Sequence, residues 1–166
     1  VIKRKKPKLA LKLLRDSYFS NEPYQSFSRI MDYSEEKGLV SQFNFMGPTS
    51  ETKDSPYALN HKDLLSNVIR AVSKRCHVVG FHPGYFTFNE PNEWIRQKEG
   101  LEESVGDKVK IGRQHVLRFS ADITPRIWDQ FGMTHDATLA FPELSGYRPG
   151  TCRTFQVYCL KERKTL

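Results

Sequence analysis

The sequence places a histidine, a proline and a glycine together at the point where an apolar run ends. The run HVVGF is followed by HPGY, so that His82 stands at the end of an expected strand, Pro83 stops the ladder and Gly84 allows a turn. An imidazole can bind a metal ion or move protons near neutral pH. A histidine that ends a strand is also often a structural residue, so its position alone leaves both roles open.

A guanidinium and a second imidazole follow in the stretch IGRQHVLRF. If this stretch is a strand, alternation puts Arg113 and His115 on one face, with Ile111 and Leu117. Charged groups in a sheet that helices cover are costly unless they face a polar site or are paired. Two interpretations therefore stay open, a polar site shared with His82 and a buried ion pair.

Three further residues are candidates for contacts with the same site. Asp136 supplies a carboxylate that could act on a substrate, stand beside the imidazoles as their nearest acidic partner, or pair with Arg113. In the loop SGYRPGT, Arg148 could clamp an anionic or sugar substrate or stay in solvent. Tyr85 opens the aromatic stretch YFTF, which could stack on a sugar ring or pack against a helix.

Common motifs for other chemistries are missing from the sequence. It contains no GxGxxG, no GxxxxGK[ST], no GxSxG and no HExxH. Nucleotide-binding, serine-hydrolase and zincin interpretations therefore have no motif to support them. The remaining histidines, His61, His77 and His135, are expected to be structural.

Helical and strand periods alternate from residue 24 onward, and this order sets the expected fold. It predicts an α/β fold with a mostly parallel sheet, right-handed crossovers and alternating helices. The helices are expected over 24–38, 61–75, 92–106 and 124–132. The strands are expected over 40–46, 77–82, 109–118, 134–140 and 154–160.

The number of strands limits the architecture. A closed (β/α) barrel takes about eight strands and about 250 residues, whereas this chain has 166 residues. The chain is therefore either a small open sheet or an incomplete barrel. In both cases, active groups gather on the loops after the carboxyl ends of parallel strands, which is where His82 falls.

Composition and charge bound the domain and its surroundings. A basic helical segment is expected over 1–23 and an α/β domain over 24–166. The net charge of +7 gathers in KRKKPK and KERK, which favours solvated ends over a polyanion-binding surface. Three cysteines without CxxC spacing argue against a zinc ribbon or a disulfide framework and predict a reducing, cytoplasmic location. We expect no nucleic-acid partner, and the sequence has no apolar run long enough to span a membrane.

Four motifs, taken in order, resemble those of a known family. HPGY, RQHVLRF, DATL and GYRPGT follow the stretch YQSFSRIMDYSEEKGLVSQFNFMG. Together they resemble the polysaccharide deacetylase-like proteins of bacterial surface-glycan clusters, a divergent branch of the carbohydrate esterase deacetylases. The resemblance runs from about Tyr24 to the C-terminus.

The resemblance implies a deformed barrel, incomplete in this chain, and metal-assisted hydrolysis of N- or O-acetyl groups. The substrate would be a polysaccharide or a sugar-lipid. A divalent metal such as Zn²⁺ would lower the pKa of a bound water to about 7 and polarise the acyl carbonyl. On this basis we expect three pairs of functional residues: His82 and His115 as metal ligands, Arg113 and Asp136 in catalysis, and Tyr85 and Arg148 in substrate binding.

Departures from the family pattern predict low activity for this chain. The family's second motif has two histidines four residues apart, but Phe86 stands four residues after His82. No aspartate pair of the kind found in the first motif precedes Tyr24, and the closing histidine of a late strand is missing. The chain therefore resembles an internal fragment of the domain, or an inactive glycan-binding or scaffold module. The open edges of an incomplete barrel also predict self-association.

Overall fold

The computed structural model describes residues 26–166, so the expected helical segment 1–23 lies outside the described residues. The chain divides into two compact units, and the boundary along the sequence falls between Ser41 and Gln42. In the first unit, helix α2 (Ser26–Glu36) lies within the helix expected over 24–38 and buries Met31 and Ser34. The chain leaves α2 through Gly38, whose φ of +65° lies in the left-handed region that favours glycine.

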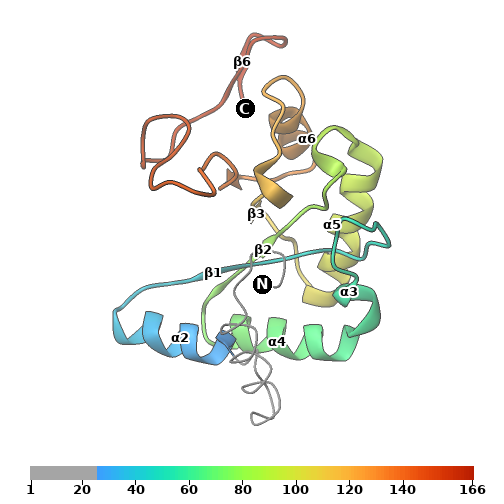
Figure 1. Cartoon of the computed structure of the whole chain (residues 1–166), viewed down its shortest axis with the longest axis vertical. Helices are drawn as coiled ribbons and strands as arrows, with labels where there is room; N and C mark the ends of the chain where they lie inside the picture. Colours follow the sequence, from blue (N-terminus) through green and yellow to red (C-terminus); the bar gives the residue numbers. More distant parts are fainter. Residues whose placement is uncertain (1–25) are drawn as a thin grey trace, which may run out of the picture. The chain divides into compact units, whose positions relative to one another are not determined.

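The second unit is built on a parallel sheet in the order β1-β2-β3-β4 (Figure 1). One row of paired residues crosses the whole sheet, from Phe45 through Phe81 and Gly112 to Asp136. The residues that follow this row leave the sheet side by side at its carboxyl edge. The α/β fold with a mostly parallel sheet is therefore confirmed, with these strands: β1 (Gln42–Phe45), β2 (Val78–Phe81), β3 (Ile111–Gly112) and β4 (His135–Asp136).

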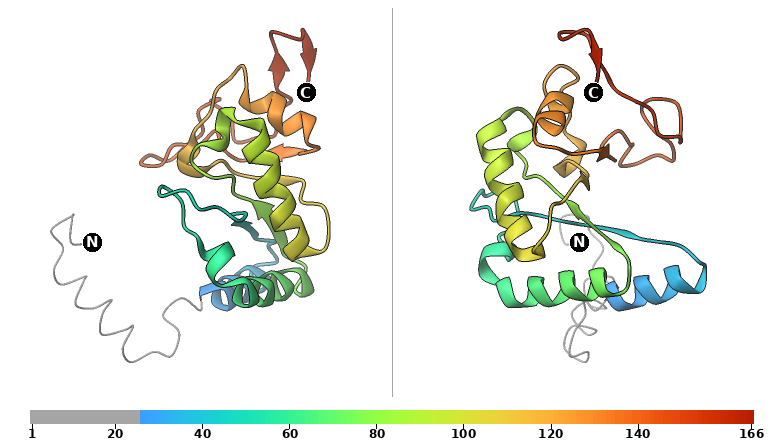
Figure 2. Two further views of the ribbon diagram at one scale, coloured as in Figure 1. Left: turned by 90° about the vertical axis from the view of Figure 1, so that its right-hand side faces the viewer. Right: turned by 180° about the vertical axis from the view of Figure 1, so that it is seen from behind.

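Helices alternate with these strands, as the periodicity predicts. Helices α4 and α5 contact each other and run in crossing directions (Figures 1 and 2). The buried Trp94 of α5 packs edge-on against Phe81 of β2, with ring centroids 5.1 Å apart, and stacks on Phe131 after α6 at 5.5 Å. This aromatic cluster holds two helices against the sheet. The helical elements are α3 (Tyr57–Asn60), α4 (Lys62–Lys74), η2 (Thr87–Asn89), α5 (Pro91–Val105), η3 (His115–Leu117) and α6 (Thr124–Gln130).

The expected strand over 109–118 is wrong beyond Gly112. After β3 the chain turns into the short helix η3, where Val116 and Leu117 have φ values of +54° and +55°. The apolar spacing of KVKIGRQHVLRF is that of a strand, but the buried side chain of Gln114 donates one hydrogen bond to the carbonyl of Gly84 and so holds the chain in a turn. A tertiary contact has overridden the local pattern.

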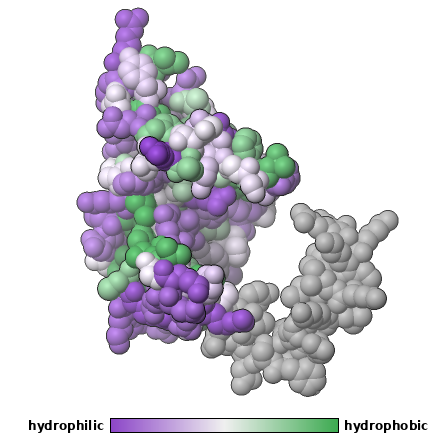
Figure 3. Space-filling view, turned by 90° about the vertical axis from the view of Figure 1, so that its left-hand side faces the viewer, coloured by the Kyte–Doolittle hydropathy of each residue, from purple (hydrophilic) through white to green (hydrophobic). Residues whose placement is uncertain are grey.

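The expected strands over 134–140 and 154–160 also differ from the structure. The first is shortened to β4. In place of the second, β5 (Tyr158–Cys159) pairs antiparallel with β6 (Lys164–Thr165) in a separate two-stranded sheet (Figure 1). All residues over 141–150 are exposed, and apolar and polar residues alternate over much of the upper surface in Figure 3.

None of the helices within residues 26–166 is both long and apolar enough to cross a membrane. The three cysteines form no disulfide. The cytoplasmic location, the self-association and the boundary between segments 1–23 and 24–166 stay predictions.

Candidate functional site

His82 follows the last residue of β2 at the carboxyl edge of the sheet. Its backbone N–H donates to the carbonyl of Phe45 at 2.8 Å, which extends the sheet ladder by one residue. Gly84, two residues on, has no positive φ, so the turn does not need glycine for its backbone angles. A Cβ at Gly84 would instead overlap the carboxylate of Asp54. The glycine of HPGY is therefore required because a carboxylate approaches the backbone closely.

The imidazoles of His82 and His115 lie together. Nε2 of His82 is 3.0 Å from Nδ1 of His115, and the two rings meet edge-on with centroids 5.0 Å apart. The predicted convergence of the two side chains is thus confirmed, although the turn η3, and not strand alternation, brings His115 to this place. Whether either histidine binds a metal ion stays a prediction.

The hydrogen bonds of His82 define which of its nitrogens carries the proton. Nδ1 lies 2.6 Å from the carbonyl oxygen of Arg113, which can only accept. Nδ1 therefore carries the proton, and the lone pair of Nε2 faces His115, whose Nδ1 must donate. Burial lowers the pKa of His82 below its usual value, and the bond to the Arg113 carbonyl opposes this shift. The net lowering of the pKa favours the neutral form of His82.

A carboxylate that sequence reasoning missed completes the group. The side chain of Asp54 is 0 % exposed, and its Oδ1 lies 3.8 Å from Nε2 of His115. Oδ1 also accepts the N–H of Tyr85 at 2.8 Å, and Oδ2 accepts the hydroxyl of Thr49 at 3.3 Å. Asp54, and not Asp136, is therefore the acidic neighbour of the imidazole pair.

Asp136 is linked to Gln114 by a chain of hydrogen bonds through Thr138. Its Oδ1 accepts the N–H and the hydroxyl of Thr138, and that hydroxyl accepts the backbone N–H of Gln114 at 2.9 Å. Neighbouring atoms displace water from the carboxyl group of Asp136, and this desolvation raises its pKa to about 6. The hydrogen bonds from Thr138 act in the opposite direction and lower the pKa. The residue as a whole is still exposed to solvent. A direct catalytic role for Asp136 stays a prediction.

Gln114 joins this chain of bonds to the HPGY turn. Its buried amide nitrogen donates to the carbonyl of Gly84 at 3.2 Å and to the hydroxyl of Thr87 at 2.8 Å. Gly84 in turn donates its N–H to the side chain of Gln97 on α5 at 2.8 Å. The motifs HPGY, RQHVLRF and DATL thus meet in one hydrogen-bond network, which we name the Gln114 network (Gly84, Thr87, Gln114, Asp136 and Thr138).

The predicted substrate-binding and catalytic side chains are less closely gathered. The guanidinium of Arg118 lies 4.1 Å from the ring centre of Tyr85 and 4.1 Å from that of Phe88, so it covers a face of each ring. Arg113 contributes its carbonyl to His82, and within residues 26–166 no ion pair joins Arg113 to Asp136. Arg148 is exposed in the loop after β4, where its backbone N–H donates to the carbonyl of Leu139 at 3.1 Å.

The part of the chain that the structure describes does not form a complete metal site. Zinc in a catalytic site takes three protein ligands and keeps one position open. Over residues 26–166, no group of three or more His, Cys, Asp and Glu side chains is placed to hold an ion. His82 and His115 offer two imidazoles, and Asp54 lies to one side of them.

The known proteins that match this chain are solved structures. No family model and no curated protein matches the sequence. A candidate polysaccharide deacetylase from Mycobacterium smegmatis matches with a TM-score of 0.55 and 20% identity over 82% of this chain and 46% of that one. Two mutants of a CE4-family pseudoenzyme, one with restored enzymatic activity, match with TM-scores of 0.50 at 16% and 15% identity, over 66% of this chain and 38% of theirs.

These matches bear on the fold alone, because all the identities are low. The chain spans less than half the length of the structures that it matches. The likeness agrees with the parallel sheet and the alternating helices. The chain has a polysaccharide deacetylase-like fold.

Proposed function

We propose that this domain acts on acetylated sugar units of a glycan, and that the pair His82–His115 with Asp54 is its chemical centre. The observation that carries this proposal is the 3.0 Å contact between the two imidazoles, with a fully buried carboxylate beside them. Such groups gather at the carboxyl edge of a parallel sheet when they serve a ligand. Hydrolysis of an N- or O-acetyl group is the reaction that suits this fold and this set of side chains.

The imidazole pair would move the proton of the reaction. The oxygen of a water molecule bonds to the acyl carbon while the pair takes up the water's proton. The bond from that carbon to the sugar nitrogen or oxygen then breaks, and the proton passes to the leaving atom, which gives acetate and a free amine or hydroxyl. Asp54 would hold the ring of His115 in place and stabilise the positive charge that forms on the pair.

A bound divalent metal would polarise the acyl carbonyl, but the described residues do not fit a complete ion site. We therefore assign no step of the reaction to an ion. The aspartate pair of active deacetylases has no counterpart beside His82 and His115 within residues 26–166, where Asp54 is the near carboxylate. Residues 1–166 would accordingly release acetate from sugars only slowly.

The incomplete ion site favours a second candidate function, glycan binding without hydrolysis. In that case the network around Gln114 would keep the shape of the sheet edge, and the imidazoles would serve as hydrogen-bonding groups for a sugar. The two candidates differ in one respect, which is whether the imidazole pair can cleave an acyl bond.

An activated ester separates them, because its leaving group needs little help. We expect the chain to hydrolyse 4-nitrophenyl acetate faster than free imidazole at equal concentration. Since general acid–base help is worth about 10² to 10⁴ in rate, His82→Ala and His115→Ala should each lose at least about tenfold. His61→Ala is the matched control, since His61 is exposed at the start of α4. Equal rates in all three variants would contradict hydrolysis by the pair.

A further inference from the structure

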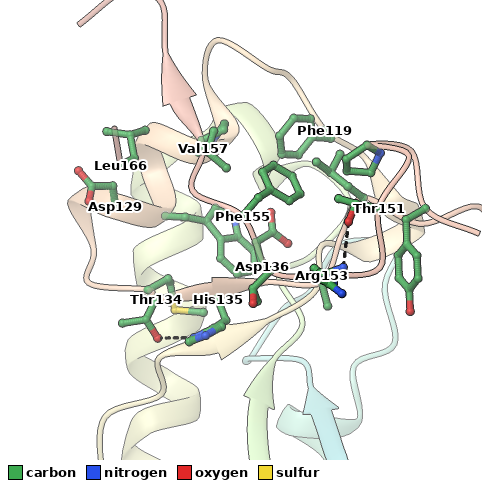
Figure 4. Close-up of a pocket in the computed structure, with 18 of the residues that line it drawn as sticks. Phe119, Asp129, Thr134, His135, Asp136, Thr151, Arg153, Phe155, Val157 and Leu166 are labelled. Atoms are coloured by element: carbon green, nitrogen blue, oxygen red, sulfur yellow. Dashed lines mark hydrogen bonds between the residues drawn. The ribbon is translucent and has the colours of Figure 1, made fainter. Parts of the chain in front are cut away.

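A cavity of about 270 Å³ lies apart from the imidazole pair, between β4, α6 and the C-terminal segment (Figure 4). Neither His82 nor His115 lines it, whereas Asp136 does. Its volume falls near the lower end of ligand pockets, which span about 300–1,000 Å³. A single small ring fits such a volume better than an extended chain does.

The walls of the cavity combine aromatic rings with a few charged groups. Phe119 and Phe155 contribute aromatic faces, and Asp136 and Arg153 contribute a carboxylate and a guanidinium (Figure 4). Aromatic faces accept the C–H side of a sugar ring, while a carboxylate and a guanidinium accept from and donate to its hydroxyl groups. This mixture suits a neutral polyhydroxylated ring better than a purely apolar molecule.

A buried donor in the same wall lacks a partner. Trp128 lines the cavity and is 4% exposed, and its Nε1–H has no acceptor among residues 26–166. Because the indole of Trp128 lies in the cavity wall, the signal of its N–H reports on what fills the cavity. The indole of Trp94 is also unpartnered, but Trp94 does not line the cavity.

The two side chains expected to bind substrate, Tyr85 and Arg148, do not line this cavity. The guanidinium of Arg118 already covers a face of Tyr85. Arg148 is absent from the cavity wall, although its neighbours Tyr147 and Pro149 belong to it. In the cavity wall, Arg153 provides a guanidinium and Phe155 an aromatic ring.

We propose that this cavity binds one neutral sugar ring, as a second subsite for a glycan held near the sheet edge. The assignment of that ring to a glycan substrate rests on the proposed function, whereas the binding of a sugar ring by the cavity does not. The two can fail separately, because neither His82 nor His115 contacts the cavity.

The indole N–H signals of the two tryptophans provide the test, in ¹H–¹⁵N spectra of the whole chain. The probes are the methyl glycosides of N-acetylglucosamine, glucose and galactose, added to millimolar concentration. We expect at least one probe to shift the Trp128 signal in a saturable way and by more than the Trp94 signal. Signals are assigned with Trp94→Phe and Trp128→Phe.

A matched pair of variants on the C-terminal segment makes the test specific. Phe155 is 50% exposed and lines the cavity, whereas Tyr158 is 56% exposed and does not. Phe155→Ala should weaken binding of the sugar by roughly 3- to 10-fold, and Tyr158→Ala should leave it unchanged. His82→Ala should also leave it unchanged, even if ester hydrolysis is lost.

Three results would overturn the proposal. The first is that no probe shifts the Trp128 signal. The second is that Phe155→Ala and Tyr158→Ala weaken binding equally, which would show a non-specific surface effect. The third is that sodium phosphate or benzene shifts the signal when no sugar does, which would assign the cavity to an anion or an apolar molecule.

Discussion

The carboxyl edge of the sheet and the C-terminal segment over 141–166 differ in the contacts that hold their side chains. At the sheet edge, buried polar side chains bond to one another, and Gln114 links two turns that are far apart in sequence. In the C-terminal segment, residues 141–150 are all exposed, and ion pairs at the surface tie the β5–β6 hairpin to α6. The first region fixes the positions of buried polar side chains, whereas the second presents side chains to solvent and to the cavity.

The largest expected difference in stability between the two regions comes from replacing a glycine by alanine. A Cβ at Gly112 would overlap the carbonyl oxygen of Phe81, so that β2 and β3 must separate. We expect Gly112→Ala to lower the free energy of unfolding by about 3 kcal/mol, measured by urea denaturation. Gly150→Ala meets open space at a φ of +74° and should cost only about 1 kcal/mol of backbone strain. Equal costs would remove the distinction between the two regions.

The next largest difference in stability comes from removing the hydroxyl group of a threonine. Thr138→Val keeps the shape of the side chain but leaves the buried N–H of Gln114 without its acceptor. We expect a loss of about 1–3 kcal/mol in the free energy of unfolding. In Thr151→Val the lost hydroxyl accepts only an exposed backbone N–H, that of Arg153, so the loss should stay below about 0.5 kcal/mol. A small loss in Thr138→Val would mean that the Gln114 network does not hold the turn.

Asp136 makes the stability of the sheet edge depend on pH. Its folded pKa of about 6 lies above the ordinary value of 3.8, so between these values the folded state binds more protons than the unfolded state. Stability from this group is therefore present below pH 4 and is lost as the pH rises to about 6. We expect thermal denaturation to show this loss in the natural chain and not in Asp136→Asn. Parallel pH profiles for the two would contradict the raised pKa.

The smallest effect belongs to the surface of the C-terminal hairpin. Glu162 pairs with Arg126 at 2.8 Å and with Lys164 at 3.1 Å, and all three side chains are about one-third exposed or more. Glu162→Gln should therefore cost less than about 1 kcal/mol, and about 1 M salt should abolish the difference. A larger cost that persists in salt would show that this hairpin is held as firmly as the sheet edge.

Sequence reasoning predicted the parts of the fold in which local patterns and tertiary contacts agree. The apolar runs around 42–45 and 78–81 form strands where expected, and His82 ends the second of them. The convergence of His82 and His115 was predicted on strand alternation, although a turn with positive φ at Val116 and Leu117 brings it about. Both paths place His115 beside the same strand end, because β2 and β3 are neighbours in the sheet.

Other parts of the site had no local signal. Asp54 lies in the polar stretch GPTSETKDSPYALN, which has the composition of a solvated loop, yet its carboxylate is buried against the backbone of Tyr85. The side chain of Arg118 looks like that of any basic residue in a strand pattern, but it fills the space between two aromatic rings. In both cases the deciding contact joins residues about thirty positions apart, which no sequence window of helix or strand length includes.

We infer that His82 and His115 form one coupled pair with a defined arrangement of protons. Long-range ¹H–¹⁵N correlation of the imidazole nitrogens near pH 7 tests it directly. We predict that His82 carries its proton on Nδ1, with Nε2 shifted as a hydrogen-bonded acceptor, and that His115 carries a proton on Nδ1. The Nε2 signal of His82 should change in His115→Ala and not in His61→Ala. A His82 protonated on Nε2, or an Nε2 signal that ignores the loss of His115, would contradict the claim.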